Sequence, residues 1–378
     1  MAGGGVPCEM RSRVSVWLGS LLAATLLAAC GSQTTAPPST GSAAASPAVT
    51  TASPAVDTPT PAPTNTPVPT AVPQPSVRSP LTGLPVASLD DITRLPLLVK
   101  LGNSGAERPQ SGLSQADVVY ESVTEGGITR YAALFQSREA TTIGPVRSAR
   151  LSDLQIAPEF GAVLAHVGAS SPIMAMLRNG SVLDLDQFFY QQYYHRTKDR
   201  VPPYNVYTGT ATLRTGAKDR GYPGTVAQLA PYSFETAPPD GGSASTVDFD
   251  FAPETHAQYV YDATQHAYHQ IEYRQPTADA ATGQPVPISN LIVQFAPVRT
   301  TTIVEDKNGS HSLDYSLTGS GKALLFHDGV EAQGRWVRKS LASRTSFEDA
   351  AGKPLALAAG SVWIALVSPE TAVTVRSL

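Results

Sequence analysis

The stretch ADVVYESVTEGGITRYAALFQ, residues 116–136, decides how the first half of this chain folds. Residues 116–121 and 128–136 are short and rich in Val, Tyr, Leu and Phe, which predicts two strands. Gly126-Gly127 lies between them and is a turn signal. A pair of strands with charged residues around its turn is therefore the starting point for both the fold and the site.

The same criteria predict further elements on both sides of this pair. Strands are expected at residues 97–101 and 161–167, and helices at 151–156, 172–178 and 210–220. The second half has the pattern of a mainly β structure, with strands at 259–261, 268–274, 291–295, 324–326, 336–337, 355–357 and 362–367. Short spacing between these strands favours antiparallel meanders over βαβ units. The predicted fold class is α+β, with layered mixed and antiparallel sheets and helices.

Composition narrows the class of protein. The 378 residues carry a net charge of −4, which argues against a nucleic-acid partner, because such binding needs a basic surface. Two cysteines, Cys8 and Cys30, exclude a disulfide-stapled scaffold.

The first 30 residues have the pattern of a secretory signal. Arg11 and Arg13 precede an apolar run at residues 14–29, which is too short for a comfortable membrane span. The run ends LAAC, which is similar to a bacterial lipobox, so Cys30 is the expected site of lipidation. Cys8 would be removed with the signal, whether the chain starts at Met1 or at Met10. The expected location is the extracytoplasmic face of a cell membrane, with the lipid on Cys30 as the membrane contact.

Composition also divides the rest of the chain. Residues 31–79 are almost entirely Ala, Ser, Thr, Pro, Val and Gly, which predicts a disordered tether that favours extended polyproline II. The remaining residues are too many for one average core, so two domains are expected. The turn-rich stretch that begins at Pro238 is the best boundary, giving domains at 80–238 and 239–378.

Several strings together identify a resemblance. They are PLTG (80–83), RPQSGL (108–113), ADVVYE (116–121), EGGITR (125–130), IGPVRSAR (143–150), NLIVQ (290–294), GSGKA (319–323), GRW (334–336) and GSVWI (360–364). They resemble the YerB-like family of bacterial lipoproteins, a domain of unknown function. The resemblance implies a two-part α+β fold on an extracytoplasmic lipid anchor, and it implies no enzyme activity.

The chain departs from that family at two places. Gly102-Asn103 stands where members often have Asp-Asn, and Pro203-Tyr204-Asn205 where they often have Pro-His-Asn. These departures argue against a shared acid–base role at those positions.

Arginines near the quoted stretch form the candidate binding site. Arg130, Arg147 and Arg150 could bind an anion beside glycines that expose the backbone, because guanidinium groups bind carboxylate and phosphate in a bidentate manner. The polar loop with Asn103 and Arg108 could line the same site. The alternative is that these arginines form ion pairs that hold loops against the sheet.

Paired carboxylates give an alternative activity. Glu121 and Glu125 could serve as the acid and base of a hydrolase or transferase, but sequence spacing does not fix their separation. No nucleophile elbow, P-loop or dinucleotide fingerprint is present, so no cofactor is expected. Whether the protein is an enzyme stays open, and the sequence favours a protein that is not.

Histidines and aromatic residues give weaker signals. His256, His266 and His269 lie near one another in sequence, but hairpin spacing favours solvated side chains, so no metal is expected. His166 lies in an apolar strand and is interpreted as a core histidine. Residues 188–194, followed by His195, could form a lid or a ligand-stacking wall, or could pack over the sheet.

The sequence thus favours a lipid-anchored binding or scaffold protein of the cell envelope. Its partner would be an anionic or glycan ligand or another envelope protein. The alternative is a cell-wall hydrolase or transferase.

Overall fold

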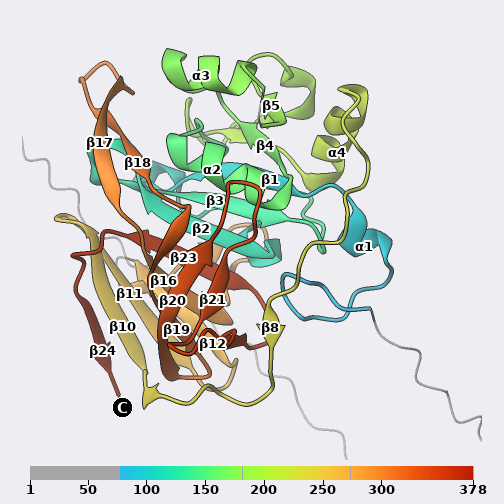
Figure 1. Cartoon of the computed structure of the whole chain (residues 1–378). Coiled ribbons are helices and arrows are strands. Elements are labelled where there is room, and N and C mark those ends of the chain that lie inside the picture. Colours follow the sequence, from blue (N-terminus) through green and yellow to red (C-terminus); the bar gives the residue numbers. More distant parts are fainter. Residues whose placement is uncertain (1–76, 181, 273, 378) are drawn as a thin grey trace, which may run out of the picture. The chain divides into compact units, whose positions relative to one another are not determined.

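An eleven-stranded sheet runs through the computed structural model and takes strands from both halves of the chain (Figure 1). The strand order is β21-β20-β19-β16-β23-β2-β3-β1-β4-β5, and β9 pairs with β20. The strand bounds are β1 (Leu97–Gly102), β2 (Val118–Val123), β3 (Thr129–Phe135), β4 (Val163–His166), β5 (Asp184–Asp186), β9 (Gly242–Ser243), β16 (Asn290–Phe295), β19 (Gly319–His327), β20 (Val330–Arg338), β21 (Ser346–Glu348) and β23 (Val362–Val367).

The structure describes residues 77–180, 182–272 and 274–377. The predicted signal, the lipidation site at Cys30 and nearly all of the tether lie outside the described residues. None of the helices in the described part is long and apolar enough to cross a membrane.

A second sheet and several helices complete the described chain. The second sheet is antiparallel, with the order β13-β12-β11-β10-β24, formed by β10 (Thr246–Ala252), β11 (Thr255–Asp262), β12 (Ala267–Glu272), β13 (Gln275–Pro276) and β24 (Val373–Arg376). The helices are α1 (Asp90–Thr93), α2 (Leu151–Phe160), α3 (Ser171–Arg178) and α4 (Thr210–Asp219), with 3₁₀ turns η1 (Gly105–Glu107), η2 (Leu113–Gln115), η3 (Glu125–Gly127) and η4 (Gln191–Tyr193). Short two-stranded pairs are β6 (His195–Arg196) with β7 (Val206–Tyr207), β8 (Ser233–Phe234) with β22 (Ala356–Leu357), β14 (Ala278–Asp279) with β15 (Gln284–Pro285), and β17 (Val298–Val304) with β18 (His311–Tyr315).

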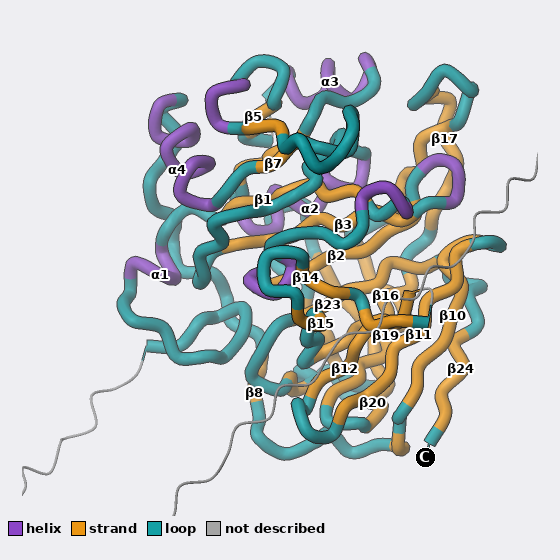
Figure 2. Tube along the Cα trace, turned by 180° about the vertical axis from the view of Figure 1, so that it is seen from behind, coloured by secondary structure: helices purple, strands orange, loops and turns teal. Residues whose placement is uncertain are grey.

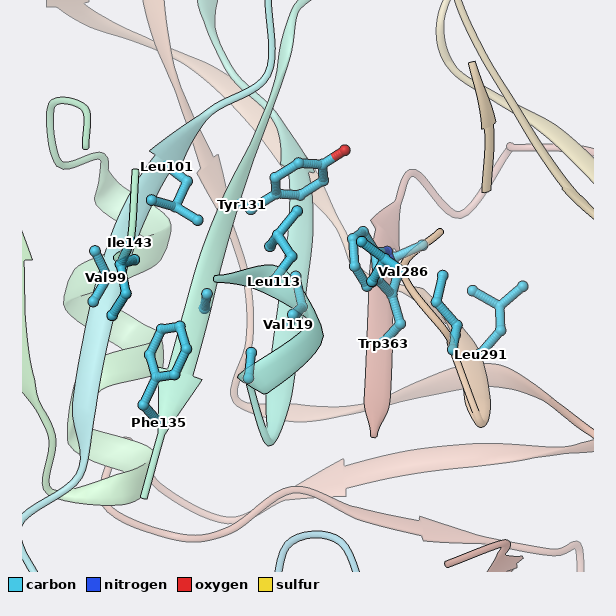
Figure 3. Packing of buried hydrophobic residues seen from close by; sticks show 14 of the residues in the cluster. Val99, Leu101, Leu113, Val119, Tyr131, Phe135, Ile143, Val286, Leu291 and Trp363 are labelled. Atoms are coloured by element: carbon cyan, nitrogen blue, oxygen red, sulfur yellow. The ribbon is translucent and has the colours of Figure 1, made fainter. Parts of the chain in front are cut away.

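Successive side chains of the central strands point to opposite faces of the main sheet and so form two hydrophobic cores, one on each face. In β1, Val99 and Leu101 belong to the first core, whereas Leu98 belongs to the second. Figure 3 shows the first core spreading from Val99 on β1 to Trp363 on β23. The second sheet and α4 cover this first core, and α2 and α3 cover the second. Figures 1 and 2 show the helices gathered near β1, β4 and β5, with β10, β11 and β24 at the other end.

The predicted fold class is confirmed, and most predicted elements form. The helices at 151–160, 171–178 and 210–219 match their predictions closely. The hairpin at Asp328-Gly329 joins β19 to β20, and both of its turn residues have positive φ. The main sheet takes strands from both sides of residue 238. The predicted division into two domains at that point is not tested by this arrangement and stays a prediction.

The expectation of antiparallel meanders is wrong for one central strand. β23 lies between β16 and β2 and pairs parallel with both. Spacing along the chain indicates only which strands are neighbours in sequence, and β23 pairs with strands more than 60 and more than 200 residues earlier. Because β23 pairs with β2 from the first half and with β16 from the second, strands of both halves form one sheet.

A buried aspartate fixes a further contact between the halves. Asp279 is fully buried, and its carboxylate accepts hydrogen bonds from the backbone N–H groups of Gly112 (3.0 Å) and Ser114 (2.9 Å). The Ser114 hydroxyl donates a third bond of 2.6 Å. These contacts join residues about 165 positions apart in sequence.

Replacing this aspartate should destabilise the whole unit. Asp279→Ala leaves three backbone donors, the N–H groups of Gly112, Ser114 and Ala281, without their acceptor, which should lower the free energy of unfolding by about 3 kcal/mol. Chemical denaturation measures the loss. Asp306→Ala is the matched control, because Asp306 also accepts backbone bonds but lies in an exposed turn. Equal losses in the two variants would contradict the role of Asp279 as a contact between the halves.

Candidate functional site

Two of the three predicted anion-binding arginines are held by one carboxylate. Arg130 on β3 lies 3.0 Å from Glu125 through Nη2. Arg150, which precedes α2, donates to the other Glu125 oxygen through Nε at 2.6 Å and also contacts the first oxygen through Nη2. All three side chains are at most 10% exposed. An anion at this place would therefore have to displace Glu125.

Glu125, Arg130 and Arg150 form a charged cluster, and burial is the largest influence on its pKa values. Burial, helped by the charge of Arg150, lowers the pKa of Arg130 to about 10. Burial also lowers the pKa of Lys100, although its 2.8 Å ion pair with Asp153 opposes the change. Burial raises the pKa of Glu125, but the hydrogen bond from Arg150 and the charge of Arg130 outweigh it and leave that pKa below its ordinary value. The cluster is a set of charges that neutralise one another.

The third arginine has its own partner. Arg147 lies 2.6 Å from a carboxylate oxygen of Glu107, and its guanidinium is 5.3 Å from the centre of the Tyr204 ring. Glu305, from the turn between β17 and β18, approaches Arg150 at 3.6 Å. The placement of all three arginines beside carboxylates favours the structural alternative, and anion binding by them stays a prediction.

Glu121 lies on the opposite face of the sheet. In the pairing of β2 with β3 it stands opposite Tyr131, whereas Arg130 stands opposite Ser122. Because neighbouring residues of a strand point to opposite faces, Glu121 and Arg130 project away from each other. Glu125 contacts Arg130 and Arg150, so the structure does not bring Glu121 and Glu125 together as a pair.

The Glu121 carboxylate is 1% exposed and is the centre of a polar network. It accepts hydrogen bonds from Asn103 (3.4 Å), Thr129 (2.8 Å), Tyr259 (3.1 Å), Gln270 (3.0 Å) and Trp363 (3.2 Å). Two of these donors come from the first half of the chain and three from the second. A buried carboxylate with this many donors is well placed to hold the two halves in register.

A pocket of about 880 Å³, whose lining residues are mostly polar, shares Asn103 and Thr129 with this network. It is lined by Asn103, Ser104, Gly105, Arg108, Gly126, Gly127, Ile128, Thr129, Glu254, Thr255, His256, Gln258, Val260, Ile271 and Arg274. Asn103 and Arg108 belong to the predicted site, and the glycines of η3 form part of the same wall. The other predicted arginines, Arg130, Arg147 and Arg150, are not among the lining residues.

Asn103 links the pocket to the hydrogen-bond network around Glu121. Its amide donates to the Thr129 hydroxyl at 2.7 Å. Its carbonyl accepts from Arg108 Nε and from Gln110, each at 2.9 Å. Contacts on several sides fix the orientation of Asn103, so this part of the pocket wall is held in one conformation.

The loop that carries Arg108 is held from outside. Arg200 donates to the backbone carbonyls of Ala106 (3.2 Å) and Pro109 (2.6 Å). His195, which follows the aromatic run at residues 188–194, stacks on Tyr207 with 6.1 Å between the two ring centres. Arg200 thus helps to position a wall of the pocket without lining it.

Reasoning from sequence missed the wall contributed by the second half. On β11, Ala257 and Tyr259 are buried, whereas His256, Gln258 and Val260 face the pocket. The partial alternation of polar and apolar residues in THAQYVYD (255–262) could have indicated a polar face on this strand. It could not have indicated which residues lie opposite that face. The Thr255 hydroxyl donates to the carbonyl of Gly127, which joins this wall to η3.

The other histidines have separate partners. His256 Nδ1 lies 2.8 Å from Asp250, His266 lies 3.0 Å from Asp328, and His269 lies 3.1 Å from a backbone carbonyl. Among the described residues, no group of three or more His, Cys, Asp or Glu side chains is placed to hold a metal ion.

His166 lies in the core, fully buried at the end of β4. Its Nδ1 is 2.9 Å from the Gly168 carbonyl, and its Nε2 is 3.3 Å from Asp184 on β5. Burial lowers the pKa of His166, but the bond to Asp184, the charge of Asp186 and the Gly168 carbonyl together raise it above its ordinary value.

The sequence matches a known family over more than half of its length. Residues 81–223 match the N-terminal domain, and residues 247–364 the C-terminal domain, of a family of proteins of unknown function, DUF3048. The chain belongs to this family.

Two comparisons with individual proteins agree. The chain is 32% identical over 302 residues to a protein of Bacillus subtilis (strain 168) named "Putative lipoprotein YerB", covering 77% of this chain and 86% of that protein. The crystal structure of the B. subtilis YerB protein matches with a TM-score of 0.69 at 30% identity, covering 79% of this chain and 99% of the other. The resemblance seen in the sequence is therefore confirmed.

The charged cluster gives a prediction about stability. Glu125→Gln removes the carboxylate shared by Arg130 and Arg150 and leaves two buried cations, so the free energy of unfolding should fall by about 3–5 kcal/mol. Denaturant titration measures this. Glu254→Gln is the control, because Glu254 is exposed at the pocket rim and should change little. A loss below about 1 kcal/mol for Glu125→Gln would show that the cluster is not structural.

His166 gives a prediction about pH. Because the folded-state pKa is raised, the charged histidine stabilises the fold below its unfolded-state pKa, and that contribution is lost as pH rises through the folded-state pKa. The stability difference between the native chain and Asp184→Asn should therefore be largest near about pH 6 and shrink above it. Chemical denaturation of both proteins at pH values from about 6 upward measures this difference. A stability difference that grows with pH would contradict the prediction.

Proposed function

We propose that this protein is a lipid-anchored, extracytoplasmic binding protein of the cell envelope, and that its polar pocket takes an envelope glycan with an anionic group. One observation carries the proposal: the pocket of about 880 Å³ lies where walls from both halves of the chain meet. This volume is in the range of small-molecule sites, roughly 300–1,000 Å³.

The chemistry of the walls suits a sugar. Polar side chains such as Thr255, His256 and Gln258 can exchange hydrogen bonds with sugar hydroxyls, while Val260 and Ile271 offer apolar contact.

Charges at the walls favour an anionic substituent. Arg108 and Arg274 line the pocket together with one carboxylate, Glu254. Arg274 is exposed, so its guanidinium group is open to an anion. A carboxylate or phosphate on the glycan would complement it.

The proposed anchor rests on the sequence and on the relative. The LAAC motif predicts lipid on Cys30 at the extracytoplasmic face, and the relative carries the name "Putative lipoprotein YerB". The tether at residues 31–79 could span on the order of 150 Å if it were extended as polyproline II. Such a reach would let the pocket meet wall polymers away from the bilayer.

The alternative hydrolase or transferase gains no support from the site. Glu121 is enclosed by hydrogen-bond donors on one face of the sheet, and Glu125 is bound to arginines on the other. Their placement favours structural roles for both.

Ligand binding gives the direct test. The carboxylated disaccharide of N-acetylglucosamine and N-acetylmuramic acid should stabilise the native chain, by about 2.7 kcal/mol at 100 times its Kd. Arg274→Gln should reduce the effect, since it removes a cation at the pocket. Arg335→Gln is the matched control, because Arg335 is an exposed arginine on β20 outside the lining residues.

Thermal unfolding with and without the sugar measures the effect. N,N′-Diacetylchitobiose, which lacks the carboxylate, should stabilise the chain less. Two outcomes would contradict the proposal: stabilisation by neither sugar, or stabilisation that Arg274→Gln leaves unchanged.

A further inference from the structure

An exposed pair of phenylalanines follows β5, in the turn before η4. Phe188 and Phe189 are each 60% exposed. The tyrosines that follow behave differently: Tyr193 is 8% exposed, and the Tyr194 hydroxyl donates to the carbonyl of Leu185. The aromatic run therefore divides into a part that packs and a part that faces solvent. Two adjacent exposed phenyl rings indicate a surface that contacts a partner.

A groove of about 380 Å³ lies beside Phe189. Met174, Leu177 and Val182 are buried residues of its lining and give it an apolar floor. Phe189, Tyr190 and Tyr222 add aromatic side chains to the lining. The groove thus continues the apolar surface of the exposed pair toward α3, which lies at the end of the unit away from β24 (Figures 1 and 2).

Two arginines flank this apolar surface. The Arg178 guanidinium lies 5.5 Å from the centre of the Phe189 ring, and Arg220 lies 4.6 Å from that of Tyr190. Arg220 also donates to the Tyr222 hydroxyl at 2.8 Å. Within the described part of the chain, neither arginine forms an ion pair with a carboxylate, unlike those of the buried cluster. Both are exposed, so both can meet an anion outside the protein.

We propose that Phe188, Phe189, Arg178 and Arg220 form a docking surface for an anionic lipid bilayer. The phenyl rings enter the boundary between headgroups and acyl chains, and the guanidinium groups meet lipid phosphates beside them. Charge complementarity favours this partner, because Arg178 and Arg220 outnumber the carboxylate of Asp184 among the lining residues of the groove, and Arg178 lies against the Phe189 ring. A bilayer presents the same arrangement, with phosphates just outside an apolar phase.

The surface is separate from the polar pocket, since the two share no lining residue. Docking would add a second contact to a lipid anchor and limit how the described unit turns at the membrane. The proposal does not depend on the ligand of the pocket, nor on lipid at Cys30, and its test uses a chain without lipid.

Vesicle binding tests the proposal. The chain from residue 31 onward, which contains the whole described unit, should bind phosphatidylcholine vesicles that contain phosphatidylglycerol and bind pure phosphatidylcholine much less. Added salt should weaken the binding. Each of Arg178→Gln and Arg220→Gln should weaken it about fivefold. The double variant Phe188→Ser/Phe189→Ser should weaken it about tenfold or more.

Matched variants elsewhere separate docking from general charge and apolarity. Arg299→Gln removes an exposed arginine on β17, and Leu89→Ser removes a 60% exposed apolar side chain before α1. Both should leave vesicle binding unchanged, and all variants should keep the native unfolding transition. The proposal is overturned if the chain does not bind anionic vesicles, if the controls lose binding equally, or if an acidic amphipathic peptide binds this surface while vesicles do not.

Discussion

The buried carboxylate of Glu121 is the constraint on which the site depends. Removing a charge from water is costly unless hydrogen bonds replace the water, so this group requires donors around it. Asn103 and Thr129 supply two of them from one half of the chain, and Tyr259 and Trp363 are among those from the other. The two halves must therefore adopt one relative arrangement, and the polar pocket lies where they meet.

The charged cluster on the other face of the sheet supports the same site indirectly. Glu125 is the first residue of η3, and the next two residues, Gly126 and Gly127, line the pocket. The ion pairs of Glu125 with Arg130 and Arg150 thus fix one end of a loop that forms part of the wall. Arg130 and Arg150 are therefore placed to hold residues that line the pocket.

Sequence patterns predicted the local structure well, because strands and helices depend on neighbours along the chain. The strand pair at residues 116–136 formed as expected. The pairing of β23 with β2 and β16 could not be predicted, since it joins segments far apart in sequence. The ribbon of β17 and β18 was also missed: every residue of β17 is exposed or half-buried, which leaves no apolar run to detect.

The site was predicted only in part, for a related reason. The loop with Asn103 and Arg108 was found because its composition is polar. Which face each charged residue occupies depends on strand register, and the sequence alone does not give the register of Glu121 against Tyr131. The wall formed by β11 follows from packing between the two halves, which no local pattern reports.

The stability of Glu121→Gln tests most directly whether this carboxylate organises the structure. A glutamine has nearly the same size, but its amide nitrogen donates, so donors such as Tyr259 and Trp363 would lose an acceptor. We expect the free energy of unfolding to fall by about 3 kcal/mol in chemical denaturation. An unchanged or higher stability, as is common when a strained catalytic carboxylate is removed, would contradict this account.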